Sequence, residues 1–256
     1  MKWFDKWRAV RQIQNSWFRK ELMALPLGLE AYWQDSARQE FEGIRTDAFF
    51  FVRAAEGLMQ FFSVVHRSRL PCALPSQAAD SVWHAWLRWD PDGLERFCIE
   101  HFGAAIPHVE RPGLGDGALL NTFVACCRRE NSALYAAQLP ALFRLDAHLC
   151  MPDGHGYWNR RGDILHARLG PRGRRLGRAL PHPELNRNAL SVAGLGRQRV
   201  AYSDGAGSMD GIGLAFIDGA SDSSCSGSDS ACDSGGGDAG SGCGSSCGGG
   251  CGGGGD

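Results

Sequence analysis

The sequence predicts an all-α domain of about six helices over residues 1–150, then an irregular Arg-rich arm over 151–200 and a low-complexity tail over 201–256. Two observations carry this prediction. Through the first 150 positions, apolar residues recur three, four or seven apart, the spacing of helices with one buried face. From Ser221 onward, the 36 residues are 14 Gly, 10 Ser, 5 Cys, 5 Asp and 2 Ala. Such a segment has almost no apolar area to offset the entropy lost on folding, so we expect a disordered tail.

The formal net charge of -1 conceals two parts of opposite charge. Residues 1–220 hold all 27 Lys and Arg against 23 of the 28 Asp and Glu, and the tail holds the other five aspartates. The chain does not open on the basic and apolar regions of a signal peptide, and it has no run of about 18 apolar residues able to span a bilayer. We therefore expect a cytoplasmic protein whose cysteines before the tail are reduced core residues. These are Cys72, Cys98, Cys126, Cys127 and Cys150.

The first predicted helix covers residues 3–25 and ends at Pro26. The apolar face that we expect to pack on the core comprises Trp3, Trp7, Val10, Trp17, Phe18, Leu22 and Leu25. The second predicted helix covers roughly residues 35–66, and its apolar stripe is wide enough to be buried on most sides. It is therefore expected to be the central helix of the core.

Two short helices with clear capping residues come next. Ser76 can accept hydrogen bonds from the free amides of a helix over about 77–89. Asp90 can cap the following helix, with Pro91 at its first position, and Gly103 supplies the left-handed stop. The tight turn between the two helices predicts a helical hairpin. Its tryptophans are expected to dock the hairpin on the second helix.

Residues 117–130 and 132–149 are predicted to form two further helices, with Pro140 kinking or splitting the second. From Met151 the helical spacing is lost. Between positions 158 and 200 there are ten Arg against one Asp and one Glu, with Gly and Pro scattered through. This composition predicts a basic arm without regular structure.

His84 is the residue whose setting most suggests chemistry. It follows Asp80 by four positions, so the two share one helix face, and a carboxylate one turn away can orient a metal-binding imidazole. Cys98 and His101 lie on the partner helix of the hairpin, and His108 follows its end. With Asp80 as the orienting group, His84, Cys98 and His108 could bind zinc or another transition metal. The alternative is a histidine that hydrogen-bonds Asp80 or a backbone carbonyl among packed aromatic rings.

Other kinds of function have weaker support in the sequence. There is no nucleophile elbow and no phosphate-binding loop after a strand, so we expect no enzymatic activity. The arm could contact nucleic acid through phosphates, and Tyr157 with Trp158 would offer rings for stacking. Salt-dependent retention on heparin or RNA that is lost when Arg172, Arg174 and Arg175 become Ala would identify this role.

The thiols of the tail are a further candidate for metal binding. Cys243, Cys247 and Cys251 are evenly spaced four apart, with Cys225 and Cys232 upstream. Flexible Gly-rich segments would let these thiolates wrap around a soft metal such as Cu(I) or zinc.

A set of residues along the helical part resembles the glycine-rich domain-containing proteins, a family with a helical domain of unknown function. The set is Asp80, Val82, Trp83, His84, Leu87, Phe97, Cys98, Phe102, Gly103, Ile106, Pro107 and His108. Asp-x-x-Trp-His is its most specific element, and the tail matches in composition only. Many relatives have a second His where this chain has Trp86, and a His-His pair in place of Pro107-His108. The resemblance covers roughly residues 35–110 and implies a helical fold but no reaction.

These observations favour a non-enzymatic helical module that binds a protein partner of unknown identity. Transition-metal binding through His84, Cys98 and His108, with or without the tail thiols, is the alternative. Nucleic-acid contact through the arm is a second alternative. The deciding observation is whether the three side chains come within about 4 Å of a common point, as metal ligands must.

Overall fold

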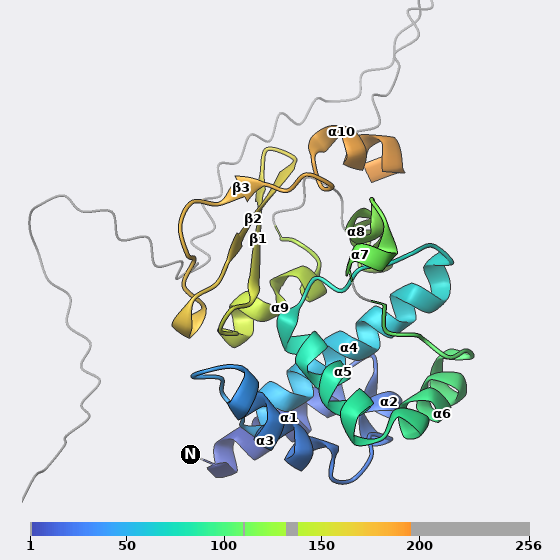
Figure 1. Cartoon of the computed structure of the whole chain (residues 1–256), viewed down its shortest axis with the longest axis vertical. Coiled ribbons are helices and arrows are strands. Elements are labelled where there is room, and N and C mark those ends of the chain that lie inside the picture. The colour runs from blue at the N-terminus through green and yellow to red at the C-terminus, as the bar shows by residue number, and fades with distance from the viewer. Residues whose placement is uncertain (1, 110, 132–137, 196–256) are drawn as a thin grey trace, which may run out of the picture. The chain divides into compact units, whose positions relative to one another are not determined.

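The structure is a computed structural model that describes residues 2–109, 111–131 and 138–195 (Figure 1). The chain divides between Asp204 and Gly205, and every described residue lies in the first part. The predicted tail and its five cysteines lie outside the described residues. Most described elements are helices, which confirms the predicted fold class. In order they are α1 (Lys2–Asn15), α2 (Arg19–Met23), α3 (Leu29–Glu40), α4 (Ala48–Ser68), α5 (Gln77–Trp89), α6 (Pro91–Phe102), α7 (Arg111–Leu114), α8 (Ala118–Arg129), α9 (Ala141–Leu149), β1 (His155–Arg160), β2 (Asp163–Arg168), the 3-10 turn Pro171–Gly173, β3 (Leu180–Pro181), α10 (Arg187–Leu190) and the π-helical turn Ser191–Leu195.

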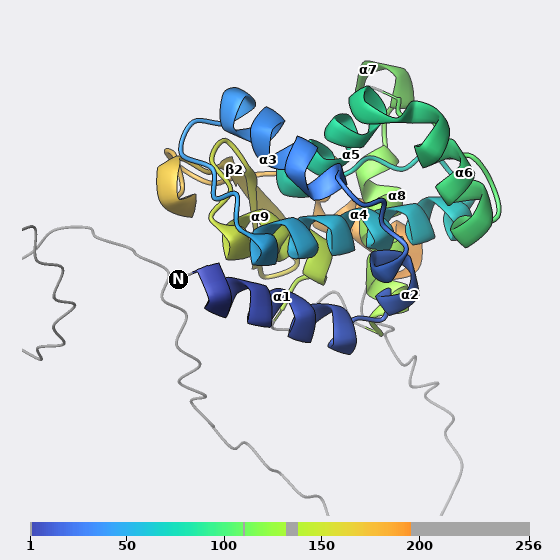
Figure 2. The same ribbon diagram turned by 90° about the horizontal axis from the view of Figure 1, so that it is seen from below.

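Helix α4 is the central element of the core, as the sequence predicts. Asp47 caps it by accepting from the Phe50 amide at 3.0 Å, and most side chains from Phe50 to Val64 are buried. It packs against α1, α5, α8 and α9, with α1 and α5 on opposite sides (Figure 2). Contrary to our expectation, α4 is long and apolar enough to cross a membrane. However, 61% of that apolar stretch is buried in this fold, and the core helix of a soluble protein has the same composition.

The helical hairpin of α5 and α6 forms where the capping residues predict it. The Ser76 hydroxyl accepts from the Ala79 amide at 3.2 Å. The Asp90 carboxylate accepts from the Gly93 amide at 2.9 Å. Gly103 ends α6 with a φ of 80°, a left-handed conformation that favours glycine. Local hydrogen bonding therefore sets the limits of both helices.

Aromatic side chains attach this hairpin and α3 to the core. Trp83 contacts Phe62 of α4 edge-on, with ring centroids 5.1 Å apart. Trp86 is fully buried. Trp33 of α3 is also fully buried, and its indole N–H donates to the Ser81 hydroxyl at 3.0 Å. The tryptophan face of α5 thus docks on the core, as predicted.

A buried carboxylate joins α9 to the start of α5. Asp146 is 1% exposed; it accepts from the Ser76 hydroxyl at 2.6 Å and from the Gln77 and Ala78 amides at 2.8 and 3.0 Å. The His155 amide donates to it as well, at 2.8 Å. Because the free amides of a first turn carry the positive end of the helix dipole, a carboxylate there is stabilising. Asp146 therefore fixes the orientation of the helix that carries Asp80 and His84.

The first predicted helix is divided, and much of its aromatic face points to solvent. Between α1 and α2 the helix is interrupted. α1 faces the core with Ala9, which is 5% exposed, and Gln12 donates to Glu56 of α4 at 2.8 Å. The prediction that the aromatic stripe faces the core is wrong for α1, because the side of the helix with Ala9 and Gln12 packs on α4 instead. The exposed members of the stripe are Trp3, Trp7, Val10 and Trp17, whereas Phe18 and Leu22 are buried.

Two other predicted helices are also shorter than expected. The helix predicted over 35–66 is interrupted between the end of α3 at Glu40 and the start of α4 at Ala48. Phe41 and Ile44, in the connection, pack against the core. Of the helix predicted over 132–149, residues 132–137 are not described, and α9 begins directly after Pro140. The expected break at Pro140 is therefore confirmed.

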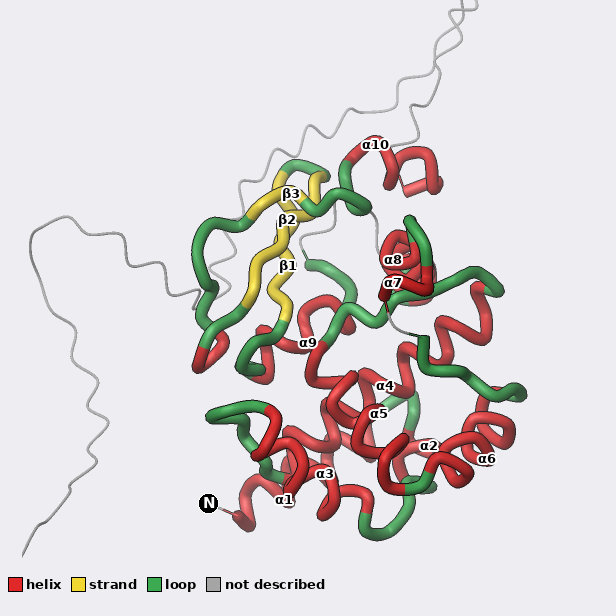
Figure 3. Tube along the Cα trace, in the orientation of Figure 1, coloured by secondary structure: helices red, strands yellow, loops and turns green. Residues whose placement is uncertain are grey.

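Part of the predicted irregular arm forms a small antiparallel sheet of β1, β2 and β3 (Figure 3). The expectation of irregular structure is wrong there. Arg161 and Gly162, with φ of 55° and 91°, form a two-residue turn between β1 and β2. Tyr157 of β1 packs edge-on against Phe143 of α9, with ring centroids 5.1 Å apart. The hairpin was not predicted because the arginines along its edges and turn face solvent. They give this stretch the composition of an irregular arm.

Candidate metal centre

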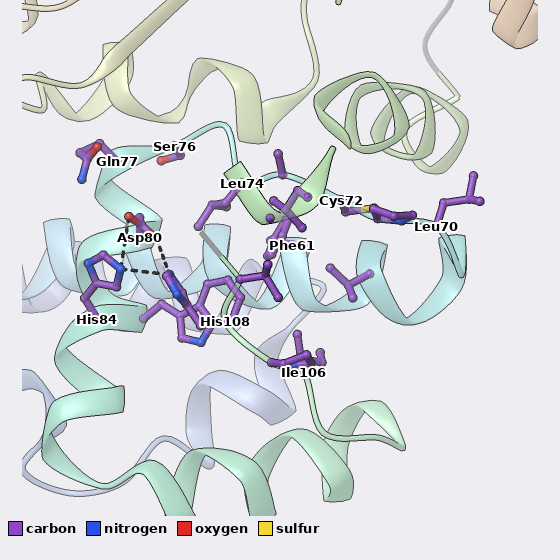
Figure 4. A pocket seen from close by; sticks show the side chains of 18 of the residues that line it. Phe61, Leu70, Cys72, Leu74, Ser76, Gln77, Asp80, His84, Ile106 and His108 are labelled. Atoms are coloured by element: carbon purple, nitrogen blue, oxygen red, sulfur yellow. Dashed lines mark hydrogen bonds and ion pairs between the residues drawn. The ribbon is translucent and has the colours of Figure 1, made fainter. Parts of the chain in front are cut away.

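Three side chains that the sequence singles out meet beside α5 (Figure 4). Asp80 and His84 lie one turn apart on α5, and His108 comes from the segment after α6. The Nε2 atoms of His84 and His108 are 3.0 Å apart. Asp80 Oδ2 lies 3.8 Å from His84 Nε2, and Asp80 Oδ1 lies 3.5 Å from His108 Nε2. One ligand atom from each residue thus lies within 4.8 Å of the other two.

The path of the chain after α6 brings His108 to α5. The left-handed Gly103 turns the chain, and Ile106 enters the core. His108 then lies edge-on against Trp83, with ring centroids 4.6 Å apart and an interplanar angle of 77°. Because Trp83 is itself packed against Phe62, the position of the His108 ring is set by the aromatic core.

The spacing of the three ligand atoms fits a transition metal. Zinc binds imidazole nitrogen and carboxylate oxygen at about 2.0–2.2 Å in a tetrahedron, so its ligand atoms lie roughly 3.3 Å apart. The two imidazole nitrogens are 3.0 Å apart, and each lies 3.5 or 3.8 Å from one of the two Asp80 oxygens, so the distances are close to this value. Two nitrogens and one oxygen suit zinc and similar first-row metals, whereas magnesium and calcium prefer oxygen alone. Three protein ligands would leave a fourth position for water or another ligand.

The trio forms part of the wall of a pocket of about 680 Å³. This volume is in the range that holds small organic molecules. The side chain of His84 is the most exposed of the three, at 39%, against 25% for Asp80 and 21% for His108. No local sequence signal predicts this pocket, because its walls come from segments far apart in the chain. The apolar lining includes Phe61, Val65, Leu70, Leu74, Ile106 and Val109.

Comparison with protein families places the chain in an uncharacterised group. A family model described as UCP032817-like matches residues 36–168, which is just over half of the chain. The chain belongs to the UCP032817-like family. No curated protein and no solved structure matches the chain. The family description does not carry the glycine-rich name, which stays a prediction.

The UCP032817-like region extends further than the resemblance seen in the sequence. It begins in α3 and ends with β2, so it includes Asp80, His84 and His108 together with the first hairpin of the sheet. The aromatic helix α1 lies outside it. The candidate metal centre therefore lies within the matched region.

Within the UCP032817-like region, the third potential ligand beside His84 and His108 is Asp80. The sequence predicted Cys98 in that role. Cys98 is 1% exposed, and burial raises its pKa to about 11, although a hydrogen bond with the Ile106 backbone acts in the opposite direction. A protonated thiol in the core is a poor metal ligand. His101 also lies elsewhere, tilted against Phe97 with ring centroids 4.4 Å apart. The side chains that the structure brings together are Asp80, His84 and His108, and Cys98 is not among them.

One of the two rings expected for nucleic-acid stacking is buried. Tyr157 is 7% exposed because it packs against Phe143. The guanidinium of Arg175 lies 5.9 Å from the ring centroid of Trp158. Trp158 is partly exposed and the arginines of this region are exposed, so nucleic-acid contact stays a prediction, without Tyr157 as a stacking ring. The tail cysteines lie outside the described residues.

Proposed function

We propose that this domain binds a transition-metal ion, zinc or a zinc-like ion, through Asp80, His84 and His108. The observation that carries the proposal is the convergence of three ligand atoms within 4.8 Å of one another. Two imidazoles and one carboxylate form a donor set that first-row metals favour. The ion would lie at the wall of the pocket, with a coordination position left for an exogenous ligand.

The competing interpretation is a metal-free hydrogen-bonded trio. One imidazole Nε2–H would then donate to the other across the 3.0 Å separation of His84 and His108. Metal binding requires both Nε2 atoms to be unprotonated, so the donating imidazole would have to adopt its Nδ1–H tautomer. The two interpretations therefore differ in whether zinc binding replaces the His–His contact.

Binding rather than catalysis is part of the proposal. Among the described residues of the pocket, Asp80 is the only carboxylate, and there is no Lys or Arg. Apart from the trio, the described lining contains one further imidazole, His155, but no Lys or Arg that could stabilise developing negative charge. Recognition of a protein partner, the first expectation from the sequence, would be additional to the metal site.

The test is zinc titration of the full chain by calorimetry, with metal content measured after dialysis. Replacing His84 or His108 with Ala removes one of three ligands, so each variant should lose about one equivalent of zinc relative to the unaltered protein. Asp80→Asn should weaken binding by about tenfold to a hundredfold, because the amide keeps the shape but removes the charge.

Matched controls come from the two predicted ligands that lie elsewhere. His101→Ala and Cys98→Ser each remove a potential donor on α6 without altering the trio, so both should retain the full zinc content. Equal zinc content in the His84→Ala, His101→Ala and unaltered proteins would sink the proposal. Zinc content that falls in Cys98→Ser as well as in His84→Ala and His108→Ala would restore the original thiol-containing set.

A further inference from the structure

Helix α1 presents an aromatic face to solvent, bordered by basic side chains. Trp3, Phe4 and Trp7 are 77%, 54% and 46% exposed, and Val10 is 53% exposed. Rings of Phe4 and Trp7 stack on each other with centroids 5.9 Å apart. The four residues project on one side because each helical residue turns by about 100°. This aromatic face is distinct from the metal centre, since α4 lies between α1 and α5 (Figure 2).

The core contacts of α1 are already made by its other side. Ala9 is buried, and Gln12 hydrogen-bonds to Glu56 of α4. The aromatic face therefore cannot turn inward without breaking the packing of α1 on α4. A face of this kind on a soluble surface marks a site of interaction.

The charges around the face indicate what it contacts. Helix α1 itself has four basic residues and one acidic residue. Arg11 lies over Trp7, with its guanidinium 5.4 Å from the ring centroid, and Lys6 is exposed on the flank. A second copy of this chain would bring like charges together, so self-association through this face is unfavourable.

We propose that α1 docks on the surface of an anionic lipid bilayer. Exposed Trp and Phe with flanking Lys and Arg are the features of helices that lie in the plane of such an interface. The rings of Trp3, Phe4 and Trp7 enter the boundary between headgroups and acyl chains, and the basic side chains contact lipid phosphates. α1 contacts the bilayer along its length and does not cross it. This proposal does not depend on metal binding.

The test is flotation of the full chain with vesicles of phosphatidylcholine alone or with about one third phosphatidylserine. The unaltered protein should float with the anionic vesicles, and binding should weaken by about tenfold as salt is raised, because salt screens the lipid charge. Joint replacement of Trp3 and Trp7 with Ser should reduce binding to anionic vesicles by about tenfold or more. Both side chains are exposed, so circular dichroism should show an unchanged helix content.

Leu27→Ser provides the matched control, since Leu27 is 99% exposed but lies outside α1. This variant should float like the unaltered protein. Failure of the unaltered protein to bind anionic vesicles overturns the proposal and assigns the face to a protein partner. Equal flotation of the Trp3→Ser/Trp7→Ser variant and the Leu27→Ser variant also overturns it, because the aromatic face would then not be the contact.

Discussion

Two kinds of contact hold the imidazoles of the metal centre. His84 follows Asp80 by one helical turn, and the backbone of α5 fixes their separation. His108 lies on no helix, and the ring of Trp83 positions it instead. The centre therefore depends on the aromatic core as much as on its polar atoms.

Thiol reactivity should follow burial. The pKa of Cys98 is raised to about 11 and that of Cys127 to about 12, mainly because burial disfavours the thiolate. At about pH 8 their thiolate fractions are lower by about a hundredfold or more than those of unperturbed thiols. In the folded chain, iodoacetamide should therefore modify the exposed Cys150 well before either residue, as measured by peptide mass spectrometry. Similar rates at Cys150 and Cys98 would contradict the described packing.

The same pKa shifts predict how stability depends on pH. The folded values of Cys98 and Cys127 lie above the ordinary thiol value of 9.0. At high pH the folded state thus holds protons that the unfolded state releases, and unfolding becomes more favourable. This contribution is full below pH 9.0 and is lost as pH rises toward about 11 for Cys98. Chemical denaturation at a series of pH values should show the decrease, and replacing both thiols with Ala should diminish it.

For single residues, the sequence predicts those contacts that depend only on the local geometry of a helix. The pairing of Asp80 with His84 follows from helical spacing alone. The choice between Asp80 and Cys98 as the third ligand does not, because it depends on the path of the chain between Gly103 and His108. That path is set by the burial of Ile106 in the core. Such packing joins distant parts of the chain and cannot be inferred from the spacing of residues in the sequence.

Between elements, Asp146 is the polar contact that ties α9 to α5. Asp146→Ala would leave the Ser76 hydroxyl and several amides without their acceptor in a buried place. We expect the free energy of unfolding to fall by about 2–4 kcal/mol, as for loss of a helix cap combined with buried unsatisfied donors. Urea denaturation measures this change. Asp153→Asn, at an exposed side chain with a φ of 55° that asparagine tolerates, should alter it by less than about 0.5 kcal/mol.

A loss of stability at Asp146 no larger than at Asp153 would contradict the proposed role of this carboxylate. Because Asp146 orients the first turn of α5, Asp146→Ala should also weaken zinc binding in the protein that remains folded. The matched Asp153→Asn variant should bind zinc normally.

The helix limits show which features of an element a sequence contains. Ser76, Asp90 and Gly103 end or begin helices through hydrogen bonds within a few residues, so their positions were predicted correctly. The side on which α1 packs was not, because amphipathic spacing identifies an apolar face without identifying its contact. Trp3 and Trp7 lie on the apolar face of α1, but Ala9, on the other side of the helix, packs against α4.

For the whole molecule, residues beyond Cys150 complete the fold. Tyr157 packs on Phe143, and the side chains of Leu185 and Leu190 are fully buried. A chain ending at Asp204 should therefore unfold with the same free energy as the full chain. A chain ending at Cys150 should lose at least about 3 kcal/mol, since it exposes the partners of several buried side chains. Equal stability of the two truncated chains, measured by denaturation, would instead support a domain limit at residue 150.

The sheet was not predicted because the high arginine content of this region indicates an exposed arm more strongly than the spacing of its apolar residues indicates strands. Ten arginines between positions 158 and 200 predict a solvated arm, and the short strands contain few apolar residues. Their buried members, Tyr157, Ile164 and Ala167, alternate only weakly with polar neighbours. Packing against α9 stabilises this hairpin, and that contact joins parts of the chain whose proximity a sequence does not reveal.

X-ray absorption at the zinc edge of the full chain, loaded with less than one equivalent of zinc, shows directly which atoms bind the ion. If Asp80, His84 and His108 are the ligands, the first shell consists of nitrogen and oxygen at about 2.0–2.1 Å, with the scattering pattern of two imidazoles. This signal should vanish in His84→Ala. A first shell dominated by sulfur at about 2.3 Å would contradict the account, because the metal would then be bound by cysteine thiolates and not by Asp80, His84 and His108.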